Sequence, residues 1–281
     1  MVGAAAARPH SLDRVVAPFA ARLVRDVLHV SGPDAVPYLQ GQLAQDVVGL
    51  AIGTSAWSLL LQPSGKTVAW LRATRTGETE VVLDGDAGSG EAIRARLERF
   101  KLRTKADLTP EWGMPCLAVR GIEGAGLPIA WPGVVGFDQL GSSGAAPEGI
   151  ATADGGAYEL ARIEAAVPAF GHELTEATIP AELGQWLIDA SVSFAKGCYT
   201  GQELVARIDS RGGNAPRPIR RLVIDGSAAV GDAVVVDDKV VGQLTSAAWS
   251  DARAASIALA PLPRAVRDGT SVGGHVAMVS P

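Results

Sequence analysis

Short runs of mainly apolar residues, bounded by turn-forming sequences, recur along this chain and are typical of β-strands. Three such runs follow one another at residues 55–61, 67–74 and 79–83, and turn-forming sequences separate them at residues 63–66 and 76–77. We therefore predict a three-stranded meander. The same reasoning predicts further strands at residues 27–30, 104–108, 116–120 and 158–167.

Apolar residues recur at helical spacing in the segments between these strands. Ile93, Leu97 and Phe100 lie on one face and predict a helix over residues 90–100. A second helix is predicted to open at Pro33, because proline is well tolerated in a first helical turn. Strands covered by helices that cross them form a compact α+β unit.

A third helix is predicted to begin at Thr200. The residues Thr200-Gly201-Gln202-Glu203 have the form of a capping box, in which Thr200 is the N-cap and Glu203 bonds back to its amide. Gly212-Gly213 then supplies a stop. Beyond residue 221 only short strands and turns are predicted, which together indicate a small all-β barrel. The strands expected there are residues 222–225, 233–236, 240–249, 254–259 and 276–279.

Composition describes an ordinary globular protein. The 281 residues suggest two or three compact units, 47% are hydrophobic and 20% are charged. A net charge of −5 gives no global attraction to nucleic acid or to an anionic membrane, so direct RNA binding is not expected. No run of about 18 apolar residues predicts a membrane span. The alanine run at residues 4–7 is too short for a signal sequence and is interpreted as a frayed terminus.

A cluster of basic residues accompanies the helix predicted at residues 90–100. Six of the twelve residues from 94 to 105 are arginine or lysine. Such clusters are usually solvated faces that need no ligand. The alternative is an electrostatic site for a polyglutamate tail or an RNA phosphate. The six residues are Arg94, Arg96, Arg99, Lys101, Arg103 and Lys105.

The two cysteines, Cys116 and Cys198, do not have the spacing of a metal site or a disulfide framework, so no metal is predicted and a reducing cytoplasm is the default location. Cys198 lies just before the helix predicted at Thr200, with Lys196 two residues away. A helix N-terminus and a nearby cation both favour a thiolate, so Cys198 and Lys196 are the candidate catalytic residues. The alternative interpretation is a small buried apolar residue.

The octapeptide Lys196-Gly197-Cys198-Tyr199-Thr200-Gly201-Gln202-Glu203 resembles the K-G-C-[YF]-x-G-Q-E signature of YgfZ-type folate-binding proteins, which are relatives of the glycine-cleavage T-protein. Residues 30–47 are similar to the opening segment of the same family. The resemblance implies an α+β fold of two intertwined ferredoxin-like α/β subdomains and a small C-terminal β-barrel. The implied bounds are residues 1–54 with 111–215, residues 55–110, and residues 216–281.

The resemblance also implies a set of folate-binding residues. Arg162-Ile163-Glu164 followed by Phe170-Gly171 is similar to a T-protein segment that lines the folate pocket, so Glu164 is expected to accept hydrogen bonds from the pterin and Phe170 to lie against its ring. Arg220-Arg221 resembles the site that presents an arginine to the folate carboxylate. Adjacent strand residues face opposite sides, so only one of these two can serve. The expected cofactor-binding set is Glu164, Phe170, Tyr199, Gln202 and Arg221.

The function implied by the resemblance is that of a tetrahydrofolate-binding accessory protein which supports iron–sulfur cluster assembly or maintenance and tRNA modification. Its expected partners are folate and iron–sulfur assembly proteins or their clients. The alternatives are an aminomethyltransferase-like enzyme and a cysteine-nucleophile enzyme. A classical aminomethyltransferase is disfavoured because Cys198-Tyr199-Thr200-Gly201 replaces the phenylalanine-isoleucine-glycine sequence of those enzymes. The catalytic aspartate of that family corresponds to Asp84, Asp86 or Glu91, between which the sequence does not decide.

Overall fold

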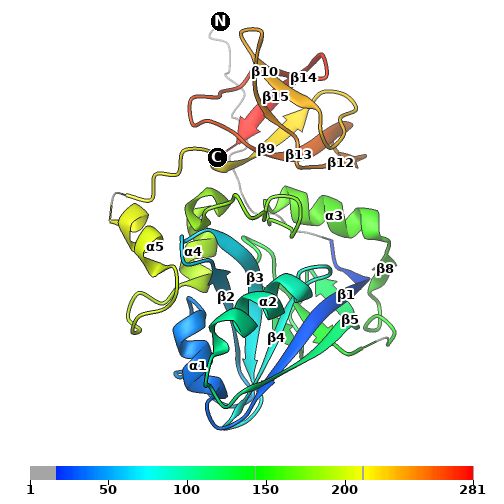
Figure 1. Cartoon of the computed structure of the whole chain (residues 1–281). Helices are drawn as coiled ribbons and strands as arrows, with labels where there is room; N and C mark the ends of the chain where they lie inside the picture. Colours follow the sequence, from blue (N-terminus) through cyan, green and yellow to red (C-terminus); the bar gives the residue numbers. More distant parts are fainter. Residues whose placement is uncertain (1–16, 143, 211, 281) are drawn as a thin grey trace, which may run out of the picture.

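The computed structural model describes residues 17–142, 144–210 and 212–280, and the alanine run at residues 4–7 lies outside these ranges. The first part of the chain forms an eight-stranded mixed sheet with helices on both faces. The last part forms a separate seven-stranded sheet that curls into a small barrel (Figure 1). None of the described helices is long and apolar enough to cross a membrane.

The eight-stranded sheet has the order β2-β3-β4-β1-β5-β7-β6, with β8 paired to one end of β1. Its strands are β1 (Phe19–Ser31), β2 (Ser55–Leu61), β3 (Thr67–Arg75), β4 (Glu80–Asp86), β5 (Asp107–Arg120), β6 (Leu127–Pro128), β7 (Gly136–Leu140) and β8 (Ala151–Ala153). The helices are α1 (Ala35–Gln42), α2 (Gly90–Lys101), α3 (Gly155–Glu164), the 3-10 turn η1 (Pro180–Leu183), α4 (Gln185–Ser191) and α5 (Gln202–Asp209).

Strand β1 joins the two halves of this sheet. It pairs antiparallel with β4 over residues 25–31 and with β5 over most of its length. The meander predicted from sequence is confirmed as β2, β3 and β4. The division of residues 1–215 into two subdomains stays a prediction.

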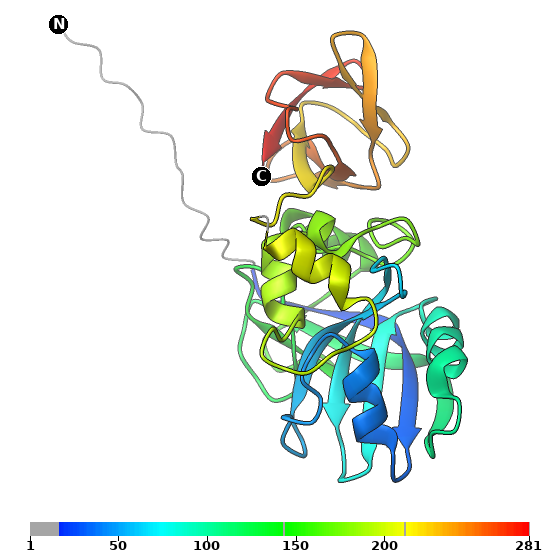
Figure 2. The ribbon, with the colours of Figure 1, turned by 60° about the vertical axis from the view of Figure 1, so that its left-hand side comes forward.

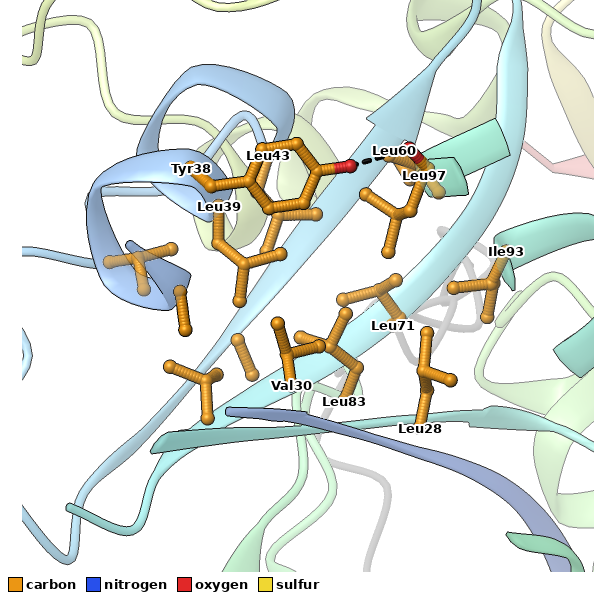
Figure 3. Close-up of a cluster of buried hydrophobic side chains, with 14 of the residues drawn as sticks. Leu28, Val30, Tyr38, Leu39, Leu43, Leu60, Leu71, Leu83, Ile93 and Leu97 are labelled. Atoms are coloured by element: carbon orange, nitrogen blue, oxygen red, sulfur yellow. Dashed lines mark hydrogen bonds between the residues drawn. The ribbon is translucent and has the colours of Figure 1, made fainter. Parts of the chain in front are cut away.

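Both faces of the sheet are buried over most of β2, β3 and β4, which explains why these strands contain apolar runs. On β2, Leu60 packs into the core beneath α1 and α2, whereas its neighbours Leu59 and Leu61 pack into the core on the opposite face. Figure 3 shows the first of these cores, where the Tyr38 hydroxyl of α1 donates a hydrogen bond of 2.6 Å to the carbonyl oxygen of Leu97 on α2. This bond ties the two helices together over the sheet.

The barrel has the strand order β11-β10-β14-β15-β9-β13-β12. Helix α3 lies between the barrel and the eight-stranded sheet (Figures 1 and 2). Ile163 of α3 packs against Ile257 and Leu259 of the barrel in a small core of its own. The barrel strands are β9 (Ile219–Ile224), β10 (Ala233–Val236), β11 (Lys239–Gln243), β12 (Ser246–Ser250), β13 (Ala255–Pro261), β14 (Thr270–Val272) and β15 (His275–Ser280).

The strand predicted at residues 158–167 is wrong, because this segment is helix α3. The Asp154 side chain accepts a hydrogen bond of 2.9 Å from the amide of Ala157 and so caps the helix. A helix of this length shares enough apolar positions with a strand for the sequence to fit both patterns. The strand predicted at 104–108 overlaps β5 only at residues 107–108, and the strand predicted at 116–120 is the last part of the same β5. The strand predicted at 240–249 is divided into β11 and β12.

Candidate ligand-binding site

A cavity of about 530 Å³ lies between the sheet, helix α3 and the segment that follows α3. Its wall from the sheet includes residues of β1, β2, β3, β4, β5 and β7, so distant parts of the chain meet there. The lining residues that carry a charge or an aromatic ring are Arg22, Arg25, Trp57, Trp70, Asp86, Arg120, Trp131, Asp138, Tyr158, Glu159, Arg162, Phe170 and His172.

A buried ion-pair network supports the floor of this cavity. Arg72 of β3 lies between two carboxylates: its Nη2 is 2.9 Å from Asp84 Oδ2, and its Nη1 is 3.0 Å from Asp138 Oδ2. Arg72 and Asp84 are opposite each other in the β3–β4 register, so the pairing is a cross-strand one. The side chains of Arg72 and Asp84 are completely buried. Removing one partner would therefore leave a charge in the protein interior without full compensation.

Two further arginines extend the network to the cavity wall. Arg25 bonds Asp84 Oδ2 at 3.0 Å and Asp86 Oδ1 at 2.8 Å. Arg120 bonds Asp138 Oδ1 at 2.9 Å. Burial alone would raise the pKa of Asp138, but Arg120 and Arg72 outweigh burial and hold that pKa below its usual value. Asp138 is therefore a fixed anion at neutral pH.

Aromatic rings form much of the remaining wall. Trp57 and Trp70 stack with their ring centroids 4.1 Å apart, and Trp131 lies 5.3 Å from Tyr158. The guanidinium of Arg120 lies 4.5 Å from the Trp131 ring, where a cation–π interaction is favourable. Burial raises the pKa of Tyr158 to about 12, so its hydroxyl stays protonated. The rings give the cavity much of its apolar surface.

Helix α3 contributes a second set of charges. Arg162 is buried, and its Nη2 lies 2.8 Å from Glu159 Oε2, while its Nη1 lies 3.2 Å from Glu173 Oε2. The hydroxyl of Ser246 in the barrel accepts a further bond from Arg162 at 2.7 Å. Arg162 thus fixes α3 to the barrel and holds the Glu159 carboxylate at the cavity. The side chain of Glu159 remains about half exposed, so it can reach a bound molecule.

Of the folate-binding residues expected from the sequence, Phe170 lines the cavity. Glu164 does not: its carboxylate is 3.2 Å from Arg253 of the barrel, and its backbone carbonyl accepts a bond of 2.7 Å from Arg221. Arg221 is therefore brought beside Glu164, but outside the cavity lining. Arg220 lines a different groove, which lies between the barrel and the α4–α5 region.

Residues 196–201, here called the signature loop, are held against helix α1 by the side chain of Lys196. Its Nζ donates to the carbonyl oxygens of Gln40, Leu43 and Gln45 at 2.5, 2.7 and 3.0 Å. An ammonium group has three N–H donors, so none is left to contact the sulfur of Cys198. Burial lowers the pKa of Lys196 to about 8, and the nearby Asp46 opposes that shift. Lys196 therefore holds the signature loop against the C-terminal end of α1.

The predicted helix after Thr200 exists as α5, but the predicted capping box is wrong. The N-cap is Gly201, with a left-handed φ of 85°, and no side chain caps the first turn. Gln202 bonds back instead, accepting a hydrogen bond of 3.1 Å from the amide of Tyr199. Glu203 pairs with Arg207. Left-handed backbone is readily adopted only by glycine, so Gly201 sets the direction of the chain here.

Tyr199 and Gln202 also lie outside the cavity lining, and Tyr199 packs against the core beside α4. Cys198 is exposed, whereas Cys116 is buried on β5. Burial raises the pKa of the Cys116 thiol to about 12, so this cysteine is inert. No group of three or more histidine, cysteine, aspartate or glutamate residues in the described ranges could hold a metal ion.

Three acidic residues are candidates for the equivalent of the family's catalytic aspartate. Of these, Asp86 lines the cavity. Asp84 is completely buried in the ion-pair network. Glu91 is exposed on α2. The Asp86 carboxylate accepts bonds from Arg25 and from the amide of Phe170, at 2.8 and 3.0 Å, which fix its orientation.

Most of the cavity lining was missed by the sequence analysis. A usable signal was present, because Arg72 and Asp84 are charged residues that follow apolar runs inside their strands. Such residues are almost never buried unless they are paired. What the sequence does not display is the strand register that brings Arg72, Asp84 and Asp138 together.

Comparisons with known proteins agree with the fold. Residues 217–278 match the model of the Glycine cleavage T-protein C-terminal barrel domain. The whole structure is similar to that of the glycine cleavage system aminomethyltransferase T from Bartonella henselae, with a TM-score of 0.71 over 93% of this chain and 84% of the other, at 18% sequence identity. The predicted α+β, T-protein-like fold with a C-terminal β-barrel is thus confirmed.

The sequence is also similar to those of two curated relatives. The chain is 29% identical to the mitochondrial iron-sulfur cluster assembly factor IBA57 homolog of Mycosarcoma maydis, over 67% of this chain and 53% of that protein. It is 26% identical to the tRNA-modifying protein YgfZ of Edwardsiella ictaluri, over 66% of this chain and 65% of that one. The matches thus span about half to two thirds of these relatives. The chain is thus similar to proteins of the glycine-cleavage T-protein type in its C-terminal barrel sequence and in its fold.

Proposed function

We propose that this chain binds a reduced folate of the tetrahydrofolate type in the cavity beside α3, and that it acts in the cytoplasm as an accessory protein for iron–sulfur cluster assembly or maintenance and, through it, tRNA modification. The observation that carries the proposal is the cavity of about 530 Å³ with aromatic walls and carboxylates at its edge. Ligand pockets commonly span about 300–1,000 Å³ and combine apolar walls with a few polar groups.

The residues of the cavity fit such a ligand. The ring of Phe170, which lines the cavity, is suited to pack against a fused heterocycle. The carboxylates of Asp86 and Glu159 can accept hydrogen bonds from the N–H groups of an aminopyrimidine edge, and neither is completely buried. A reduced folate supplies nitrogen atoms that carry one-carbon units. The chain itself supplies the binding surface and the fixed carboxylates.

In the proposed complex, the carboxylate of Glu159 accepts hydrogen bonds from the N–H groups of the pterin. We expect Glu159→Gln to weaken tetrahydrofolate binding about tenfold or more, because a hydrogen bond to a charged group contributes roughly 1.5–3 kcal/mol. Isothermal titration calorimetry measures this change. Glu164→Gln is the matched variant on the same helix, and its affinity should stay near that of the wild type. A loss of affinity confined to Glu164→Gln would instead support the assignment made from the family resemblance.

The proposed iron–sulfur role is supported by the similarity to an iron–sulfur cluster assembly factor and by the exposed position of Cys198. The exposed sulfur lies in a loop that Lys196 and Gly201 fix in place, so Cys198 is available for transient sulfur or cluster chemistry. We expect Cys198→Ser to reduce the activity of iron–sulfur enzymes in cells lacking the wild-type chain, while the purified variant keeps its folate affinity. Lys196 supports this role by positioning the loop. Full activity with Cys198→Ser would remove the cysteine from the mechanism.

A second candidate is an aminomethyltransferase-like enzyme that transfers a one-carbon unit to tetrahydrofolate. The observation in its favour is the Asp86 carboxylate at the cavity, oriented by Arg25. Transfer to tetrahydrofolate by the purified chain would favour this candidate over a binding role. The accessory role is preferred because the similarity extends to an assembly factor and a tRNA-modifying protein.

A further inference from the structure

A second cavity of about 450 Å³ lies beside the first, and the two share Phe170 as a wall. One side of it is the face of α2 that carries part of the basic cluster. The other side is the segment that follows Phe170. Its lining residues are Gln62, Val68, Ala92, Ala95, Arg96, Arg99, Phe170, Gly171, Leu174, Thr175 and Glu176.

Arg96 is an unusual lining residue because it is a buried cation that forms no ion pair with a carboxylate of the described residues. It is 4% exposed. Its Nε donates to the carbonyl oxygen of Leu61 at 2.8 Å, and its Nη1 donates to Gln42 Oε1 at 3.0 Å. Its Nη2 has no hydrogen-bond partner within the described part of the chain. The Phe100 ring, 4.0 Å away, offers a cation–π contact but no negative charge.

The contrast with Arg72 shows what Arg96 lacks. Arg72 is equally buried, but two aspartates compensate its charge. Burial lowers the pKa of Arg96, and the neighbouring Arg99 lowers it further despite an opposing effect of Tyr38. A buried charge that is not paired is costly, so a negative group entering this cavity would be stabilised. Glu176 lies at the exposed rim and forms no ion pair with Arg96.

We propose that this second cavity is an anion-binding site, which takes the carboxylate or phosphate group of a small molecule whose apolar part packs on Ala92, Ala95 and Leu174. Arg96 binds the anion from the buried side, and Arg99 binds it from the mouth. This proposal does not rest on folate binding in the first cavity, although the two cavities share the Phe170 wall. Arg103 and Lys105, which belong to the same basic cluster in sequence, do not line it.

The test is a titration of the full chain with two probes, inorganic phosphate and glutarate, followed by NMR chemical shifts of the α2 amides. We expect saturable binding of at least one probe, and the probe that binds identifies the chemical class. Arg99→Gln should weaken binding about tenfold, because a charge-assisted hydrogen bond to the anion is lost. Arg103→Gln removes the same charge outside the cavity and should leave binding unchanged.

Ala95→Leu gives a second variant that leaves every arginine in place. The added side chain fills the cavity from an exposed helix position, so we expect a tenfold or greater loss of binding with the fold retained. Three results would overturn the proposal: no saturation with either probe, an equal effect of Arg103→Gln and Arg99→Gln, or unchanged binding by Ala95→Leu.

Discussion

Replacing Arg72 with methionine should lower the free energy of unfolding of this protein by about 3–5 kcal/mol, the usual cost of removing one partner of a buried ion pair. Methionine keeps much of the volume of the side chain but none of its charge. Asp84 and Asp138 would then share only Arg25 and Arg120, and the bonds from Arg72 to both carboxylates would be lost. Urea denaturation followed by tryptophan fluorescence measures the change, because Trp57 lies beside Arg72.

Arg103→Met is the matched control for charge and size. Arg103 is exposed just beyond α2, so its replacement should change the free energy of unfolding by no more than about 0.5 kcal/mol. The double variant Arg72→Met/Asp84→Asn should lose less than the sum of the two single variants, because the two residues form one interaction. An effect of Arg72→Met as small as that of Arg103→Met would contradict the network.

Replacing Gly201 with alanine should be the most damaging small change within the signature loop. Gly201 has a φ of 85°, and a Cβ at this position would lie 2.5 Å from the carbonyl oxygen of Gln62 and 2.8 Å from Leu61 Cβ. The left-handed conformation alone costs a non-glycine residue about 1–3 kcal/mol. The clash with the backbone of the β2–β3 turn adds to that cost, since backbone cannot move aside as a flexible side chain can.

Gly197 is the matched control for Gly201 because it lies in the same loop and also lacks a side chain. A Cβ at Gly197 meets no atom within 4 Å, and its φ is not positive. Gly197→Ala should therefore change the free energy of unfolding by about 0.5 kcal/mol or less. Thermal unfolding of both variants tests the pair. Equal losses from Gly197→Ala and Gly201→Ala would mean that the loop is not held against the β2–β3 turn.

The parts of the fold that sequence predicted well are those with strong local signals. Strand β2 was predicted with the bounds that the structure has, and α2 within one residue. Both have a clear apolar pattern between glycine or proline turns. Helix α3 was predicted as a strand because its ten residues fit both the helical and the strand pattern of apolar positions. Helix α4 was not predicted because it spans only seven residues. Packing against the barrel decides the conformation of α3, and packing is a tertiary property.

The site was harder to predict than the fold. The signature around Cys198 pointed to a conspicuous loop, and the structure explains that loop through Lys196 and Gly201 rather than through contact with the cavity. The cavity itself depends on side chains from six strands and one helix. These side chains come together because of the strand register and the order of strands in the sheet. A single sequence does not display either property.

Calorimetric titration of the purified chain with tetrahydrofolate, beside Phe170→Ala and Phe194→Ala, is the experiment that decides whether the cavity is a folate site. We expect the wild type to bind with a dissociation constant on the order of 1 µM or tighter, and Phe170→Ala to bind roughly tenfold more weakly because an aromatic wall of the cavity is lost. Phe194 is 55% exposed and outside the cavity lining, so Phe194→Ala should bind like the wild type. No heat of binding with the wild type, or an equal loss in both variants, would contradict the folate assignment.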